Sequence, residues 1–157
     1  MKICLLVIGK TDEVYLQKGI ELFMKRIPHY ISFEMKVIPD LKNSKNLSEE
    51  QQKAKEGELI LQQLTSSDEV LLLDEQGTET SSTDFARFLE KKMGSGIKRL
   101  VFLIGGPYGF SESIYSRATG KVSLSKMTFS HQMVRLIFLE QLYRVLTILK
   151  GEPYHHQ

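Results

Sequence analysis

The 157-residue chain has no tryptophan, four prolines, four histidines and one cysteine. A single cysteine excludes an internal disulfide and cannot supply a thiolate metal site. Because Cys4 lies within the apolar run of residues 2–8, we interpret it as a small core residue rather than a catalytic thiol. The histidines His29, His131, His155 and His156 form no H-x-x-x-H pair. The sequence therefore gives no reason to expect a bound metal.

Long hydrophobic runs and a strong excess of charge are also missing. No apolar stretch approaches the roughly 18 residues of a membrane span, and the start of the chain lacks the pattern of a secretory signal, so we expect no membrane and a cytoplasmic protein. A net charge of +2 and a pI near 8.6 are too mild to demand a nucleic-acid partner. With 41% hydrophobic and 25% charged residues, residues 1–157 are expected to form one globular domain.

Two common nucleotide-binding motifs are absent as well. The chain contains no G-x-x-x-x-G-K-[ST], which argues against a phosphate-cradling NTPase. Its most glycine-rich segment reads G-G-P-Y-G, which lacks the G-x-G-x-x-G spacing and comes late in the chain. A dinucleotide enzyme is therefore a poor match to this sequence.

Short apolar runs alternate with helical patterns along the chain. Strands are expected at residues 2–8, 31–38, 69–74, 99–104 and 121–124, and helices at residues 13–26, 48–64, 83–93, 111–118 and 130–150. Thr11 or Asp12 can cap the first helix, and Ser48 with Gln51 forms a capping box for the second. This order predicts an α/β fold, with a three-layer, mostly parallel sheet and helices on both faces.

The stretch R-L-V-F-L-I-G-G-P-Y-G-F, residues 99–110, organises the chain. A strand buried on both faces leads there into Gly105, Gly106 and Gly109, which allow positive φ or a close approach of the backbone to a ligand. The same residues suit an ordinary turn between a strand and a helix. The motif alone leaves both interpretations open.

Three successive strands end in unusual loops, at residues 74–77, 105–109 and 123–129. Because ligands bind beyond the carboxyl ends of the strands of an open parallel sheet, we expect the three loops to share one pocket. Apolar side chains there can flank an aromatic base and two hydroxyl groups can bond it, although serine and threonine before a helix are often only caps. These residues are Leu73, Leu124, Met127, Phe129, Ser125 and Thr128.

The last helix, residues 130–150, is apolar on nearly every side, with Arg135, Glu140, Gln141 and Arg144 as its strong polar positions. A surface helix normally has a single apolar stripe. We therefore expect a homodimer that packs partly through this helix. The alternative is a helix enclosed by its own sheet and neighbouring helices.

Several segments together resemble the ribosomal RNA large subunit methyltransferase H family, the pseudouridine N3-methyltransferases of the SPOUT class. They are L-L-L-D-E-Q-G, L-I-G-G-P-Y-G, S-L-S-K-M-T-F-S-H-Q-M-V-R, E-Q-L-Y-R and the terminal G-E-P-Y-H-H. The resemblance covers the whole chain in order and length. It implies a homodimer that uses S-adenosylmethionine to methylate N3 of a pseudouridine in a hairpin loop of 23S rRNA in the assembled ribosome. It also implies a deep trefoil knot towards the C-terminus.

The same resemblance assigns the site residues. Arg144, Tyr154 and His155 are implied to act on the target base, with the tail that carries the last two reaching a partner's pocket. The implied cofactor contacts are Leu73, Gly105, Leu124, Ser125, Lys126, Met127, Thr128 and Phe129.

The sequence does not decide which chemical roles Arg144, Tyr154 and His155 have towards the target base. The N3 of pseudouridine is neutral near pH 7, so a cation that favours its anion or a base that takes its proton would help methyl transfer. Arg144 or His155 can do the first and His155 the second. Arg144 can equally form an ion pair with Glu140 one helical turn away, and Tyr154 can stack on the base or hold the tail.

Two other functions remain to be weighed against this one. One is a non-catalytic ribosome- or RNA-binding factor of the same fold, which the intact glycine loop and the S-L-S-K-M-T-F loop argue against. The other is a flavodoxin-like enzyme acting on a small molecule. The apolar last helix and the Tyr-His tail argue against it.

Overall fold

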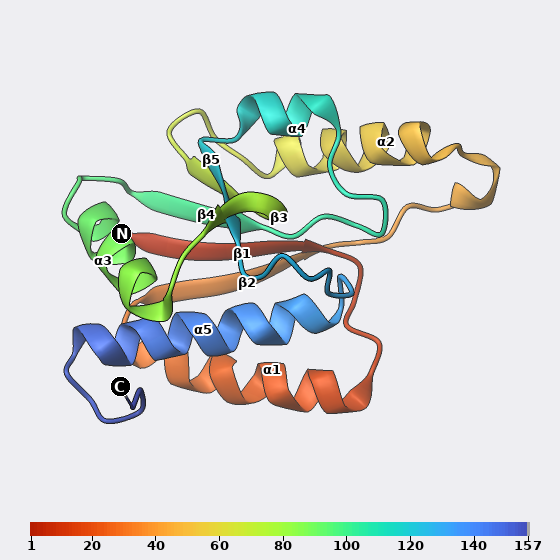
Figure 1. Cartoon of the computed structure of the whole chain (residues 1–157). Helices are drawn as coiled ribbons and strands as arrows, with labels where there is room; N and C mark the ends of the chain where they lie inside the picture. Colours follow the sequence, from red (N-terminus) through yellow and green to blue (C-terminus); the bar gives the residue numbers. More distant parts are fainter. Residues whose placement is uncertain (157) are drawn as a thin grey trace.

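The structure is a computed structural model that describes residues 1–156 (Figure 1). Strands and helices alternate along the chain, as the sequence predicts. The strands are β1 (Lys2–Ile8), β2 (Ser32–Ile38), β3 (Glu69–Glu79), β4 (Arg99–Leu103) and β5 (Gly120–Ser123). The α-helices are α1 (Val14–Arg26), α2 (Glu49–Gln62), α3 (Ser82–Met93), α4 (Glu112–Arg117) and α5 (Met133–Leu149), and short 3₁₀ turns are η1 (Ile27–His29) and η2 (Ser44–Asn46).

The five strands form one sheet in the order β2-β1-β4-β3-β5. Every strand pair in it is parallel. The predicted α/β fold with a mostly parallel sheet is therefore confirmed, and the sheet is parallel throughout. Since all the strands run the same way, their carboxyl ends lie along one edge of the molecule.

Side chains that alternate along the strands divide the core into two halves. In β1, Ile3, Leu5 and Val7 pack against α1, α3 and α5, whereas the alternate residues Cys4 and Leu6 pack against α2 and α4. Figure 1 shows the same three layers, with α2 and α4 above the sheet and α1 and α5 below it. Cys4 is 1% exposed, and burial raises the pKa of its thiol to about 11, as expected for an inert core residue.

The third strand is longer than the sequence predicts. The loop expected at residues 74–77 is instead part of β3, which pairs with β5 on both sides of a register shift between Leu73 and Thr78. Gly77 lies at this irregularity, where a Cβ would be 2.8 Å from the backbone carbonyl carbon of Lys121 and 2.8 Å from the nitrogen of Val122. The glycine that resembles a turn signal therefore permits two backbones to lie against each other.

Helix ends differ from the predictions in a few places. The Ser48–Gln51 capping box is present, with both of its hydrogen bonds formed. The predicted caps of α1 are wrong, because its N-cap is Glu13. Thr11 Oγ1 instead accepts a hydrogen bond of 3.1 Å from the last helix. α5 begins at residue 133 rather than 130.

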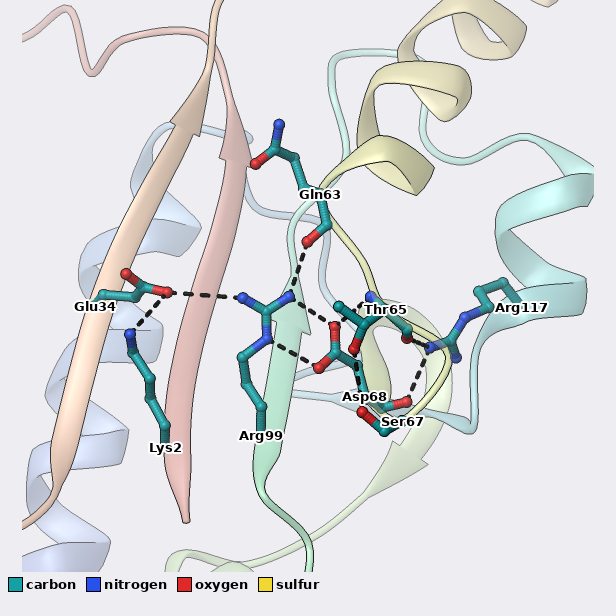
Figure 2. A network of polar contacts seen from close by, with 8 residues as sticks. All are labelled: Lys2, Glu34, Gln63, Thr65, Ser67, Asp68, Arg99 and Arg117. Carbon is teal, nitrogen blue, oxygen red and sulfur yellow. Dashed lines mark hydrogen bonds and ion pairs between the residues drawn. The ribbon is translucent and has the colours of Figure 1, made fainter.

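A polar network ties together the amino ends of the strands (Figure 2). Arg99 donates from Nε and Nη2 to Asp68, at 3.0 and 2.6 Å, and from Nη2 to the carbonyl oxygen of Gln63 at 2.8 Å. Burial raises the pKa of Asp68, but the bonds from Arg99 and Thr65 outweigh it and hold that pKa below its ordinary value. The network closes this edge of the sheet, opposite the edge where the strands end.

Candidate functional site

A cavity of about 610 Å³ lies beyond the carboxyl ends of β4 and β5, beside residues 73–76 in the middle of β3. It is formed by the three segments that the sequence predicts to meet as loops, the first of which is part of β3, together with the start of α5 and Tyr115 of α4. Its size is that of a small-molecule site. We call it the loop pocket.

Most of the residues implied as cofactor contacts line the loop pocket. Lys126 does not, because its side chain is 85% exposed and its Nζ lies 3.7 Å from Glu79. Met127 lies at the rim and is 76% exposed. The residues that line the pocket are Leu73, Gly105, Leu124, Ser125, Met127, Thr128 and Phe129.

The glycine loop, residues 105–109, has a conformation that the sequence predicts only in part. Of its three glycines only Gly109 has a positive φ, at +85°. A Cβ on Gly105 would lie 3.1 Å from the Phe110 ring and 3.2 Å from the carbonyl carbon of Gly109. Because Gly105 has no side chain, Phe110 and Gly109 of the same loop can pack directly against its backbone. The loop is closed by a 3.1 Å hydrogen bond from the nitrogen of Gly109 to the oxygen of Gly106.

Polar side chains join the loops to one another. Thr128 of the loop after β5 donates a hydrogen bond to Glu75 of β3. Asp74 accepts a 2.7 Å bond from the hydroxyl of Tyr115, and burial with this bond raises the pKa of Tyr115 to about 12. Tyr115 was not predicted as a site residue, because one tyrosine in a short helix gives no pattern in the sequence.

Arg135 holds the start of α5 against the end of β1. It is fully buried and donates to the backbone oxygens of Ile8 and Gly9, at 2.7 and 2.8 Å. Burial holds its pKa below the ordinary value. In the sequence Arg135 is only a polar break in an apolar helix. In the structure it satisfies carbonyl groups that β1 leaves unpaired and positions the helix beside the loop pocket.

The three residues implied to act on the target base lie together at the other end of α5. We call them, with Glu140, the tail cluster. Glu140 Oε1 accepts from Nε and Nη2 of Arg144, at 3.1 and 2.6 Å, and from the hydroxyl of Tyr154 at 3.1 Å. Nη1 of Arg144 lies 3.0 Å from Nδ1 of His155. The ion pair between Glu140 and Arg144 that the sequence allows is therefore formed.

The contact between Arg144 and His155 fixes the state of the imidazole. A guanidinium can only donate, so Nδ1 of His155 accepts and the ring carries its hydrogen on Nε2. Nε2 is buried and has no hydrogen-bond partner within residues 1–156. His155 thus presents one unused N–H donor.

The loop pocket lies beside the start of α5, whereas Glu140 and Arg144 of the tail cluster lie in the middle and the C-terminal half of the helix. Val134 lines the pocket and Arg144 belongs to the cluster, so about 15 Å of helix separates them at 1.5 Å per residue. Figure 1 shows the C-terminus beside the end of α5 that is far from the carboxyl edge of the sheet. Within one chain, the tail does not lie over its own pocket.

A parallel α/β sheet with a pocket over its carboxyl edge defines a protein that binds a small molecule there. A family profile described as "Predicted SPOUT methyltransferase" matches residues 1–155, and the chain belongs to this family. Among its relatives are proteins named ribosomal RNA large subunit methyltransferase H. Those of Parabacteroides distasonis, Flavobacterium johnsoniae and Christiangramia forsetii are 62%, 63% and 60% identical over 157 residues, the full length of both chains.

SPOUT methyltransferases use S-adenosylmethionine, and the loop pocket suits this cofactor. Apolar side chains such as Leu73 and Leu124 can flank an adenine ring, and the glycine backbone admits close contact. The carboxylates of Asp74 and Glu75 lie at the same edge, where a cationic group is favoured.

Over residues 1–156, no three histidine, cysteine, aspartate or glutamate side chains gather as a metal ion would require. Within the same range, no helix has both the length and the apolar character to cross a membrane.

Proposed function

We propose that the protein transfers a methyl group from S-adenosylmethionine to N3 of a pseudouridine in a hairpin loop of 23S rRNA, within the assembled ribosome and in the cytoplasm. The observation that carries this proposal is the 62% identity, over the whole of both chains, to a ribosomal RNA large subunit methyltransferase H. A mild net charge of +2 agrees with a substrate whose bulk supplies further contacts.

The cofactor supplies an electrophilic methyl group on a sulfonium centre, so the chain's task is to position the base and to ease the loss of the N3 proton to solvent. The loop pocket orients the cofactor, and holding two reactants in line can supply much of the rate. Arg144 remains cationic, and its bonds to Glu140 fix its direction. Its charge favours the N3 anion.

His155 acts here as a donor and not as a base. Because Arg144 occupies Nδ1 and the hydrogen is on Nε2, the ring has no free lone pair with which to take a proton. When substrate binding uncovers the buried Nε2, its hydrogen can bond a carbonyl oxygen next to N3, where negative charge spreads when the proton leaves. Of the two roles left open by the sequence, the structure favours stabilisation of the anion.

The protein acts as a homodimer in which the tail of one subunit completes the pocket of the other. The separation of about 15 Å between the loop pocket and the tail cluster supports this arrangement, because neither can complete the other within one chain. α5 also has partly exposed apolar residues, such as Met133 and Ile137, which a second subunit can cover.

The chain also forms the deep trefoil knot implied by the family. The close approach of the β3 and β5 backbones at Gly77 supports the proposal, since chain segments that are threaded past one another must pack closely. The single domain of residues 1–157 would contain the knot.

The function is tested with ribosomes from a strain that lacks this protein, incubated with the purified chain and methyl-labelled S-adenosylmethionine. Label is expected in 23S rRNA, at N3 of one pseudouridine located by mass spectrometry of RNA fragments. Binding of the cofactor without label in any RNA would instead support the non-catalytic RNA-binding factor.

A further inference from the structure

The glycine loop has a buried acidic residue behind it that is not part of the loop pocket. α2 packs there, with Glu56, Gly57 and Ile60 as its buried residues. Glu56 is 3% exposed and does not line the pocket. Glutamate is almost never buried so fully without a partner, so this position needs an explanation.

Gly106 is the residue that Glu56 contacts. A Cβ built on Gly106 would lie 2.8 Å from both carboxylate oxygens and 3.1 Å from the carboxyl carbon, and these three atoms of Glu56 are its nearest neighbours. The φ of Gly106 is not positive, so its backbone is open to any L-residue. Glu56, and not backbone strain, therefore restricts position 106 to glycine.

Hydrogen bonding does not explain why the carboxyl group of Glu56 is buried. Its Oε2 accepts one long bond of 3.3 Å from Nε2 of Gln52, and its Oε1 is buried without a partner within residues 1–156. Burial raises the pKa of this carboxyl group, the bond from Gln52 lowers it, and the charge of Asp40 raises it further. Burying the Glu56 carboxyl group with a single long hydrogen bond lowers folding stability, so we expect this residue to have a role in the adjoining loop.

We infer that Glu56 is a positioning residue for the S-adenosylmethionine pocket: its carboxyl group fills the space behind Gly106 and sets where the glycine loop lies against the cofactor. The identity of the ligand rests on the proposed function. Because the oxygen of Gly106 accepts from the nitrogen of Gly109, a shift of Gly106 moves the closed loop as a unit. Glu56 thereby acts on the pocket without touching its interior.

The test is a double-mutant cycle read by calorimetric titration with S-adenosylmethionine and, separately, S-adenosylhomocysteine. Gly106→Ala is expected to weaken binding about tenfold, because the new methyl group and Glu56 compete for one space. Adding Glu56→Ala to that variant is expected to restore affinity to within about threefold of wild type. Glu56→Gln keeps the shape and is expected to retain affinity.

Matched controls come from the same chain. A Cβ on Gly94 would have only carbonyl oxygens at 3.8 Å as neighbours, so Gly94→Ala should leave affinity unchanged. Glu58 is exposed on α2, so Glu58→Ala should do the same. In assays with ribosomes, Gly106→Ala is expected to raise KM for the cofactor and to leave kcat nearly unchanged, a split that general loss of folding would not produce.

The outcomes separate this inference from the proposed function. The inference would be overturned, and the proposed function left standing, if Gly106→Ala lost the same affinity in the single variant as in the double variant with Glu56→Ala. Wild-type affinity in Gly106→Ala would have the same consequence. A wild-type protein that binds neither compound would overturn both. If Gly106→Ala does not fold, recovery of a thermal transition in the double variant reports the same rescue.

Discussion

At the scale of single residues, the chain uses buried polar groups at its two sites. Arg135 gives its hydrogen bonds to strand-end carbonyls, and Glu140 holds both Arg144 and Tyr154. Each guanidinium is held by several acceptors, so its direction is set by the fold. Among the residues that the structure describes, Oε1 of Glu56 and Nε2 of His155 are buried near these sites without a hydrogen-bond partner. Unpartnered groups of this kind are where substitutions are most informative.

Substitutions of His155 show whether it donates a hydrogen bond to the target base or takes a proton from it. His155→Ala is expected to lower kcat about a hundredfold, the usual cost of removing one donor to a developing anion, and to leave the affinity for the cofactor unchanged. His155→Gln retains an N–H donor and should keep kcat within about tenfold of wild type. Equal losses of kcat in the two variants would argue for a base. Nitrogen NMR of the wild-type imidazole checks independently that the hydrogen is on Nε2.

Glu56 should make folding stability depend on pH. Its pKa in the folded protein is above the ordinary 4.5, so the folded state holds this proton more tightly than the unfolded state does. The free energy of unfolding is therefore expected to fall as pH rises from 4.5 through the raised pKa. Glu56→Gln, which has no proton to lose in this range, should remove that pH-dependent loss. Urea unfolding of both proteins from pH 4.5 to pH 8 measures it, and parallel curves would contradict it.

At the scale of elements, the extent of β3 is set by its pairing with the neighbouring strands β4 and β5. Its first half pairs with β4, and its pairing with β5 continues beyond the register shift to Glu79. Asp74 and Glu75, on this irregular part, contact α4 and the loop after β5. The irregularity therefore brings three elements of the loop pocket together.

Gly77 should tolerate no side chain. Gly77→Ala is expected to cost about 1 to 3 kcal/mol in the free energy of unfolding, because its Cβ would meet β5 backbone, which cannot rotate aside. Gly94→Ala, with open space around it, should stay within about 0.5 kcal/mol of wild type. Chemical unfolding at equilibrium compares the three proteins. A neutral Gly77→Ala would show that the β3–β5 crossing is looser in solution.

At the scale of the whole molecule, the two functional regions are separated along α5. The loop pocket lies at the carboxyl edge of the sheet, and the tail cluster is held against the C-terminal half of α5. Tyr30, which directly follows η1, helps to anchor the tail by donating a hydrogen bond of 2.7 Å from its hydroxyl to Glu152. A second copy of the chain can bring the two regions together.

Mixed dimers test that arrangement. Gly105→Val, in which a side chain would disrupt the glycine loop, is expected to abolish cofactor binding, and His155→Ala to abolish most transfer. Refolded together in equal amounts, the two inactive variants should regain about one quarter of wild-type activity, since half of the dimers then hold one intact composite site of two. Methyl transfer to ribosomes measures the recovery. No recovery, with mixed dimers shown by mass spectrometry, would place tail and pocket in the same chain.

Local patterns in the sequence predicted most of the fold. Alternating strands and helices, the Ser48–Gln51 capping box and the buried run before Gly105 all follow from short-range chemistry, so the parallel sheet and the meeting of three loops could be predicted. The extent of β3 could not, because the Q-G pair is a turn signal locally and only pairing with β5 continues the strand.

The sequence by itself determined the fold class and, through family motifs, predicted most of the residues that line the loop pocket. Only the tertiary structure decided what those residues contact. In the structure, the carboxyl group of Glu56 fills the space behind Gly106, and Nδ1 of His155 accepts a hydrogen bond from Arg144. The physical reason is range: a capping box or a buried strand depends on neighbours a few residues away, whereas Glu56 and Gly106 are brought into contact only when α2 packs behind a loop fifty residues further along the chain.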